Sequence, residues 1–291
     1  MNSKTLLYIV KRLLLAVLTV WVVITVTFFA TRAVPGGPFA SEKAITPAAK
    51  AALEAKYGLD KPVLEQYTTY LKDIVLHFDF GPSLKQRGRQ VIDVITDGLK
   101  TSAKLGVIAA FASLICGVVL GAIAALRRNK VIDRVIMVIT TAFVSMPSFI
   151  MGSLMLVAFS IKLAILPANG STTEGLILPV ITLALYPTAY ITRLTRSSML
   201  DVLGQDYIRT AKAKGVPGKR IIFGHALKNS LIPVITYFGP MLAYIVTGSL
   251  VVEQIFAVPG IGRAFVNSII NRDYPLIMGT TIVLAALIVI M

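Results

Sequence analysis

The chain has 291 residues, of which 56% are hydrophobic and 15% are charged, and its net charge is +15 at pH 7. Soluble globular domains carry about 25% charged residues, so this composition excludes a soluble architecture and indicates an integral membrane protein. A net positive charge of this size would suggest nucleic-acid binding in a soluble chain, but the distribution of the charge along this sequence has another explanation.

Six stretches contain no charged residue, and each is long enough to cross about 30 Å of hydrocarbon as a helix. They are Leu13–Thr31, Leu105–Leu126, Val135–Ile161, Gly175–Thr192, Asn229–Val252 and Tyr274–Met291. The first is too long for a cleaved signal peptide, and no small-residue cleavage site follows it. The third contains Pro147, which predicts a kink. The last is still apolar where the sequence stops, so we expect a short tail to be missing.

The positive charge alternates along the chain. Residues 1–12, 127–134 and 193–228 carry net charges of +3, +3 and +6, whereas 32–104, 162–174 and 253–273 carry +3, 0 and 0. This alternation is typical of the positive-inside rule and predicts that both termini are cytoplasmic in a multi-pass protein of the cell membrane. The charge is therefore explained by topology, and no nucleic-acid partner is expected.

Residues 32–104 form the largest segment between predicted spans. Thr46 followed by Pro47 predicts a helix start, and Tyr57-Gly58 predicts its end. A second helix is expected from Asp60-Lys-Pro62 to Asp79, and a third, beginning near Val91, leads into the second span. This insert is either a helical cap that packs on the spans or a surface that receives a substrate-delivery partner, and the sequence leaves both open.

Catalytic and metal-binding motifs are not found. The sequence has no phosphate-binding loop, zinc-protease motif or nucleophile elbow, and neither His77 nor His225 has a metal-ligand neighbour at useful spacing. The lone Cys116 can form no internal disulfide. Ion-coupled carriers usually place ionisable groups inside their spans, and these spans have none, so we expect a passive conduit moved by another subunit. Two other classes of membrane protein are alternatives to a passive conduit: a secondary carrier or channel, and an intramembrane enzyme.

The segment 193–228, which we call the coupling loop, is too long for a simple turn. Residues 206–214 predict a short helix, and Gly215 is placed to end it in a conformation that other residues tolerate poorly. Val216-Pro-Gly218 turns the chain, and a second amphipathic helix is expected over Lys219–Lys228. The small residues Ala211 and Ala213 allow close approach of a partner surface.

These residues carry a resemblance. Arg209-Thr-Ala followed by Gly215 resembles the Glu-Ala-Ala-x-x-x-Gly motif of permease subunits in ATP-binding-cassette importers, and the departures at Arg209 and Thr210 are similar to the peptide/nickel permease branch. His225-Ala-Leu-Lys228 fits the same branch. Further matching segments extend over almost the whole chain; they include Thr31-Arg32, Pro35-Gly-Gly-Pro38, Tyr57-Gly-Leu-Asp-Lys-Pro62, Gln66-Tyr67, Asp79-Phe-Gly-Pro-Ser83, Pro259-Gly-Ile-Gly262 and Asn271-Arg-Asp273. The Asp79–Ser83 segment is closer to oligopeptide than to dipeptide permeases.

The resemblance implies an all-α domain of six spans with the type I importer fold. It also implies a first permease subunit that works with a second, unlike one, two ATPase subunits and an extracytoplasmic peptide-binding protein. No cofactor is expected on this chain, because the partner subunits would bind ATP and magnesium. The resemblance places ATPase coupling on Tyr207, Arg209, Thr210, Ala211, Lys212, Ala213, Lys214, Gly215 and His225. The substrate would be an oligopeptide, with a dipeptide, nickel or a glycoside as alternatives.

Two further groups of residues are candidates. Gly239 and Pro240, with Thr247, Gly248 and Ser249, either shape a gate on the pathway or provide small residues for close helix packing. Glu253, with the turn Pro259, Gly260 and Gly262, is interpreted as outer-loop structure or as a binding-protein contact. We expect three regions: the first span (1–31), the insert (32–104) and the core with the coupling loop (105–291).

Overall fold

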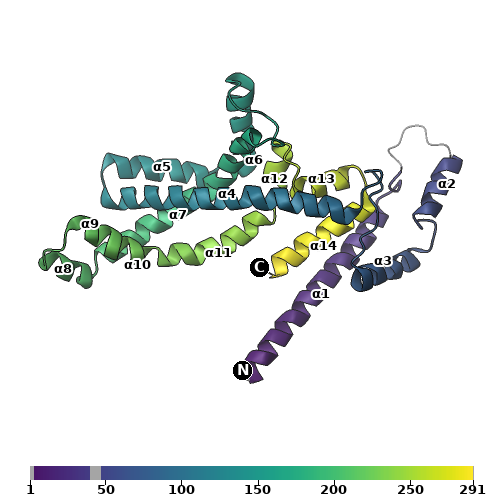
Figure 1. Ribbon diagram of the computed structural model, residues 1–291, viewed down its shortest axis with the longest axis horizontal. Coiled ribbons are helices and arrows are strands. Elements are labelled where there is room, and N and C mark those ends of the chain that lie inside the picture. The colour runs from purple at the N-terminus through teal and green to yellow at the C-terminus, as the bar shows by residue number, and fades with distance from the viewer. Residues whose placement is uncertain (1–2, 40–46, 291) are drawn as a thin grey trace. The chain divides into compact units, whose positions relative to one another are not determined.

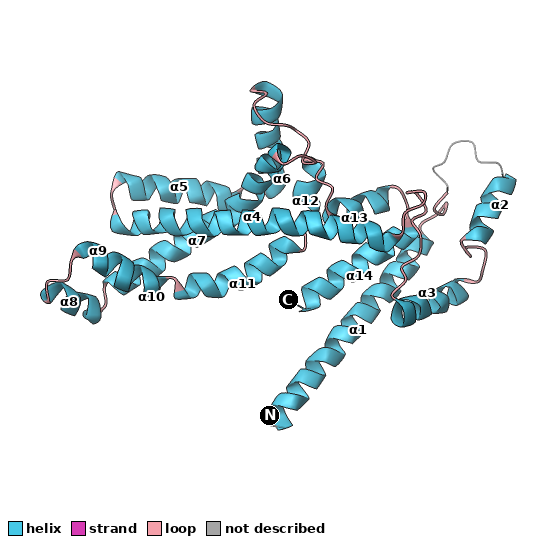
Figure 2. Ribbon diagram, viewed as in Figure 1, coloured by secondary structure: helices cyan, strands magenta, loops and turns pink. Residues whose placement is uncertain are grey.

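The structure is a computed structural model that describes residues 3–39 and 47–290. Regular secondary structure in these two ranges is helical (Figure 2), as the sequence predicts. The elements are α1 (Ser3–Ala33), α2 (Pro47–Lys56), α3 (Val63–His77), α4 (Val91–Leu126), α5 (Val131–Ser145), α6 (Ser148–Met155), η1 (Leu156–Lys162), η2 (Glu174–Leu176), α7 (Ile177–Leu203), α8 (Asp206–Ala213), α9 (Gly218–Arg220), η3 (Ile221–Leu227), α10 (Lys228–Ser230), α11 (Ile232–Val246), α12 (Leu250–Ile255), α13 (Ile261–Ile270) and α14 (Tyr274–Ile290). The elements η1 and η3 are π-helices, and η2 is a 3₁₀ turn.

Among the described residues, four helical segments are long and apolar enough to cross a membrane. They are Lys4–Ala33, Val91–Leu126, Glu174–Leu203 and Ile232–Ile255. Val131–Ser145 and Ser148–Lys162 meet the same criteria only as a pair, and the 107° bend between them at Pro147 confirms the predicted kink. A pair bent this sharply forms either one broken span or a re-entrant loop. The sixth predicted span is the shorter apolar helix Tyr274–Ile290. The polytopic all-α class is confirmed, and the count of six spans stays a prediction.

The chain divides into two compact units. One contains Met1–Lys100 and Gly260–Met291, and the other contains Thr101–Pro259. Helix α4 contributes its first residues to one unit and the remainder to the other. The three-region partition drawn from the sequence stays a prediction.

In the first unit, α1 and α14 lie side by side (Figure 1), and α13 also packs on α14. The core contains Phe28 of α1, Ile95 at the start of α4 and Met278 of α14. Gly279 permits the close approach of α14 to α4, because a Cβ there would lie 2.5 Å from the side chain of Val91. Small-residue contacts of this kind are typical of membrane helix packing.

The insert follows the predicted order of helices. Helix α2 begins at Pro47, and the expected cap at Thr46 lies outside the described residues. Gly58 follows it with φ +64°, a left-handed conformation suited to a helix stop. Helix α3 ends at His77, and its C-cap Phe78 (φ +52°) lies just before the predicted break at Asp79.

In the second unit, α4 packs closely against α7. A Cβ at Gly117 would lie 2.7 Å from the side chain of Ile191, and one at Gly121 would lie 2.6 Å from the carbonyl oxygen of Thr192. The two glycines are four residues apart and therefore share one face of α4, the spacing of the Gly-x-x-x-Gly packing motif. A Cβ at Gly106 would lie 2.8 Å from the carbonyl oxygen of Ile245 in α11, so α4 also approaches α11 closely there.

Helix α7 differs from the prediction in its length. The fourth span was expected to end at Thr192, but the helix continues to Leu203. The charges at Arg193 and Arg196 mark where the side chains of this segment change from apolar to polar. The helix continues beyond this point because its backbone hydrogen bonds form in water as well as in lipid. Arg196 forms a bidentate ion pair with Asp133 of α5 (2.6 and 2.8 Å), which ties this extension to the neighbouring helix.

Candidate functional site

The predicted short helix in the coupling loop forms as α8, Asp206–Ala213, with Lys214 as its C-cap. Gly215 adopts φ +73°, its N–H donates to the carbonyl of Lys212 (3.0 Å), and the N–H of Val216 donates to the carbonyl of Ala211 (3.1 Å). These two bonds make a Schellman motif, in which the residue after the C-cap takes the left-handed conformation that glycine adopts without strain. The sequence prediction for Gly215 is thus confirmed at the level of backbone geometry.

The inner face of α8 packs against neighbouring helices of the second unit. Ile208 is fully buried in a cluster with Met199 of α7, Ile221 and Ala226. The hydroxyl of Tyr207 accepts a hydrogen bond from the side-chain amide of Asn229 (2.9 Å). A short helix held by a buried anchor, a side-chain bond and a Schellman stop has little freedom to rotate, so its outer face has a defined orientation.

The outer face of α8 is small, basic and exposed. The exposed candidate residues are Tyr207, Arg209, Thr210, Lys212, Ala213, Lys214 and Gly215. Ala211 is half-buried beside Val216, so it packs inward rather than toward a partner. The Arg209 guanidinium lies 3.4 Å from the Asp206 carboxylate, and both side chains are highly exposed. A pair this exposed contributes little stability and leaves Arg209 available to a partner's polar groups.

The second helix of the coupling loop is a continuous helical run through α9, η3 and α10, with a π-helix at its centre. His225 is half-buried on this run. The sequence analysis did not single out Phe223, which is 67% exposed on η3. The signal was its place on the polar side of the amphipathic pattern.

The candidate gate residues lie on α11 and on the break that follows it. Gly239 is exposed, with open space where a Cβ would stand, and Pro240 lies inside the helix. The helix ends at Thr247, Gly248 takes φ +98°, and the Ser249 hydroxyl caps α12 by accepting from Val252 N–H (3.2 Å). The structure thus places two of these residues on an open helix face and three at a break between helices.

Glu253 is fully buried in the second unit. Its carboxylate accepts hydrogen bonds from the Ser102 hydroxyl (2.7 Å) and from the Ser249 N–H (3.1 Å), and its carbonyl accepts from Val258 N–H (2.9 Å). This geometry links α4 to the break before α12 and is that of a structural anchor. Downstream, Pro259 is exposed and closes the second unit, whereas Gly260 and Gly262 belong to the first unit and begin α13.

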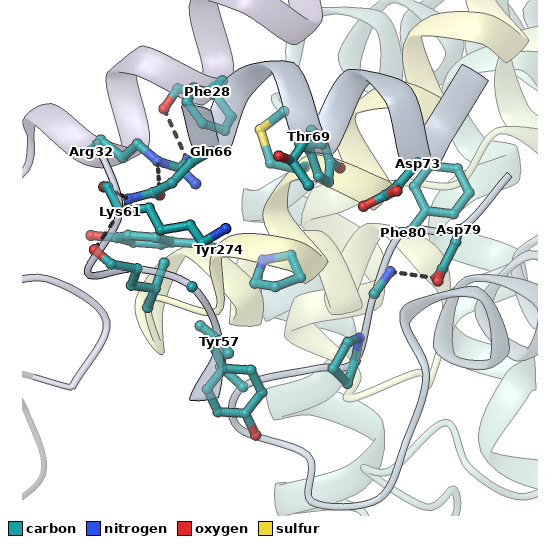
Figure 3. Close-up of a pocket in the computed structure, with 18 residues that line it drawn as sticks. Phe28, Arg32, Tyr57, Lys61, Gln66, Thr69, Asp73, Asp79, Phe80 and Tyr274 are labelled. Carbon is teal, nitrogen blue, oxygen red and sulfur yellow. Dashed lines mark hydrogen bonds between the residues drawn. The ribbon is translucent and has the colours of Figure 1, made fainter. Parts of the chain in front are cut away.

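The first unit contains a cavity of about 260 Å³ beneath the insert (Figure 3). Arg32 donates to the Gln66 side chain (3.0 Å), and its guanidinium lies over the Phe28 ring, 3.4 Å from the centroid. Gln66 in turn donates to the carbonyls of Leu59 and Lys61 (3.1 and 2.8 Å). Tyr70 lines the same cavity, and burial raises the pKa of its phenol. These contacts join α1 to α3 and α3 to the preceding turn, and the joined segments form one wall of the cavity.

Two family models match the chain. The family described as "Binding-protein-dependent transport system inner membrane component" matches residues 117–291, and its N-terminal companion matches residues 5–105. The chain belongs to this family. It is a multi-pass protein of the inner membrane and a permease subunit of an ATP-binding-cassette importer.

Relatives of known name cover nearly the whole chain. The dipeptide transport system permease protein DppB of Bacillus subtilis (strain 168) is 46% identical over 285 residues, 98% of this chain and 92% of the relative. The oligopeptide transport system permease protein OppB of Salmonella typhimurium is 44% identical over 283 residues, 96% of this chain and 92% of the relative. The DppB protein of Lactococcus lactis subsp. cremoris is 40% identical over 284 residues, 97% and 93% of the two chains.

Permease subunits of this family are non-catalytic and work with ATPase and binding-protein components. Several segments that carry the family resemblance hold the first unit together. Buried Asp273 accepts from the Ser83 hydroxyl, from Leu84 N–H (3.1 Å) and from Leu276 N–H (3.4 Å), which fastens the insert to the start of α14. Arg272 donates to the carbonyl of Pro35 (2.8 Å). In this permease, these motifs stabilise the fold.

Proposed function

We propose that the chain is the first of two unlike permease subunits of an oligopeptide importer. A binding protein delivers the peptide to the outer mouth, ATP binding closes two ATPase subunits, and the coupling loop transmits their movement to the spans. The observation that carries this proposal is the outer face of α8: it is exposed, built of small and basic residues, and fixed in orientation by Ile208 and the Gly215 stop.

The proposed orientation places both termini and the coupling loop in the cytoplasm. The net charge of +6 on residues 193–228 supports this side, since basic loops are retained in the cytoplasm. The full assembly would contain this chain and a second homologous permease in the lipid bilayer, together with two ATPase subunits and an extracytoplasmic peptide-binding protein. ATP and magnesium would be bound by the ATPase subunits, and this chain would carry no cofactor.

Dipeptides are the second candidate substrate. The 46% identical relative is named a dipeptide permease, whereas the 44% identical relative is named an oligopeptide permease. The segment 79–83 favours the oligopeptide type. Choice among peptides would then lie largely in the binding protein.

The test is uptake by proteoliposomes that contain the complete complex. We expect uptake of a tetraalanine peptide only with ATP inside and peptide-loaded binding protein outside, and we expect loaded binding protein to stimulate ATP hydrolysis. Uptake that persists without ATP and follows an ion gradient would contradict the proposal and support a secondary carrier. A dialanine preference at saturating binding protein would favour the dipeptide assignment.

A charge placed on α8 tests the coupling role. Ala213→Asp and Gly215→Asp should leave membrane insertion intact and uncouple uptake from ATP hydrolysis, because both positions are exposed toward the partner. Ala211→Asp should also abolish uptake, but with some loss of stability because Ala211 is half-buried against the core of the loop. Unchanged uptake in the two exposed variants would contradict the coupling role.

A further inference from the structure

Helix α7 exposes aromatic and polar side chains in the middle of a membrane span. Tyr186 and Tyr190 are 50% and 40% exposed, and Arg193 continues the same line toward the end of the helix. The spacings of four and three residues put all three side chains on one face. Tyr186 lies near the middle of the span Glu174–Leu203, two turns before Arg193, and Tyr190 lies one turn before Arg193, where the helix becomes polar.

Helix α11, which packs beside α7 (Figure 1), presents a similar face. Tyr237, Pro240 and Tyr244 follow one another at spacings of three and four residues, and Thr236 lies next to them. Tyr244 is 77% exposed. The rings of Tyr190 and Tyr237 stack with their centroids 4.3 Å apart, so the two lines of side chains join into one surface. We call this surface the tyrosine face: Tyr186, Tyr190, Thr236, Tyr237, Pro240 and Tyr244.

Helices α4 and α5 of the same unit expose mainly aliphatic side chains. Helix α4 exposes Val107, Ile115 and Val119, and α5 exposes Val135 and Val138. These are side chains suited to lipid. A phenol hydroxyl in the middle of hydrocarbon lacks a hydrogen-bonding partner, and for that reason membrane tyrosines gather at the interfaces. Several tyrosines exposed at mid-span therefore indicate a surface that meets polar groups or water.

We propose that the tyrosine face lines the translocation pathway and binds the main chain of the passing peptide. This inference rests on the proposed function and names the site at which the substrate is contacted. Phenol and threonine hydroxyls both donate and accept, so they can pair with the N–H and C=O groups of any peptide bond. The aromatic rings offer apolar area to side chains of any kind, without a charge that would select for one sign.

The backbone of α11 adds to this chemistry. Pro240 has no N–H to donate to the carbonyl of Thr236 one turn earlier, which turns that carbonyl into an additional acceptor for a peptide N–H. Gly239, which precedes Pro240, has open space around its Cα, so a substrate main chain can approach the helix closely. In this proposal, Gly239 lets the peptide main chain approach α11, and Pro240 leaves a carbonyl with which the peptide can bond.

A second permease subunit seated on the tyrosine face would be the competing occupant. Such an interface would bury the hydroxyls in a dry, packed surface, whereas a pathway keeps them accessible to water for part of the transport cycle. Accessibility to a water-soluble reagent therefore separates the two.

The chain offers a clean background for this test, because Cys116 is its single cysteine. In the complete complex carrying Cys116→Ser, cysteines would replace Tyr190 and Tyr244 in turn, with Val119→Cys on the aliphatic face of α4 as the matched control. We expect a charged methanethiosulfonate reagent to modify the two tyrosine positions at least about tenfold faster than the control, since the thiolate needs water to form. Rates equal to the control in a complex that transports peptide would overturn the inference.

Conservative variants test the peptide contact itself. Tyr190→Phe and Tyr244→Phe keep the ring and remove the hydroxyl, so each should lower tetraalanine uptake by about threefold to tenfold, the worth of one hydrogen bond, while ATP hydrolysis stimulated by loaded binding protein is retained. Tyr8→Phe, on an exposed tyrosine of α1, should change neither. Wild-type uptake by both variants would overturn the inference. A wild-type complex that takes up no peptide would instead contradict the proposed function.

Discussion

The Gly215 stop of α8 makes a quantitative prediction about docking of the ATPase. Gly215 has φ +73°, and a Cβ built there meets no atom within 4 Å. The cost of Gly215→Ala is therefore a backbone cost alone, about 1–2 kcal/mol for an L-residue in the left-handed region. If the variant relieves this strain by losing the Schellman motif, the ratio of the docking-competent form of α8 to the form without the motif falls by a factor of about 5 to 30.

The assay is a titration of purified ATPase subunits onto the permease pair in nanodiscs, read out by binding and by stimulated ATP hydrolysis. We expect Gly215→Ala to weaken the apparent affinity by up to that factor, because the affinity falls with the fraction of the permease in the docking-competent form. Gly215→Asn should lose less, because asparagine tolerates the left-handed region. Gly218→Ala is the matched control: Gly218 lies in the same loop with equally open space, but its φ is outside that region. Equal affinity of Gly215→Ala and wild type, or an equal loss in Gly218→Ala, would refute the reasoning.

Three further changes test the packing and the buried polar contacts within the two units. Gly121→Val should lower the melting temperature of the detergent-solubilised protein, because overpacking against α7 costs about 1–3 kcal/mol. Gly204→Ala should not lower it, because a Cβ at Gly204 has its nearest contact at 3.5 Å. Equal melting temperatures of the two variants would count against the close contact of α4 with α7. Asp133→Asn and Arg196→Gln should show a coupling energy of about 0.5–3 kcal/mol in a double-mutant cycle, and strict additivity would show that the ion pair is not formed. Asp273→Asn should speed hydrogen exchange in the loop before α4, because an amide cannot accept all the bonds that the carboxylate accepts, and unchanged protection would contradict the anchoring role.

Much of the fold follows from local chemistry that the sequence displays. Charge-free runs identify the spans, Pro147 identifies the 107° bend, and Gly215 identifies the end of α8. The end of α7 does not follow from the same signals. Arg193 marks the change from apolar to polar surroundings, but the helix ends ten residues later at Leu203, because membrane depth and helix length are set by different forces.

The candidate site was predictable where it rests on backbone conformation and less so where it rests on tertiary contacts. The pairing of Tyr207 with Asn229 and the burial of Ala211 depend on how α8 packs against the second helix of the coupling loop, which no local pattern encodes. The tyrosine face was overlooked for a different reason. The sequence prediction for the spans depends on charged side chains, and Tyr186 and Tyr190 are uncharged. Their spacing of four residues, which puts both on one helix face, is visible in the sequence.

A site-specific cross-link tests the proposed docking of an ATPase subunit on α8. Ala213→Cys in the Cys116→Ser background places a single reactive thiol on the exposed face of α8. With a benzophenone maleimide attached, illumination of the complete complex should join this chain to an ATPase subunit, and more efficiently with ATP than without nucleotide. Cross-links that form only to lipid or to the second permease, in a complex that hydrolyses ATP on addition of loaded binding protein, would contradict the account.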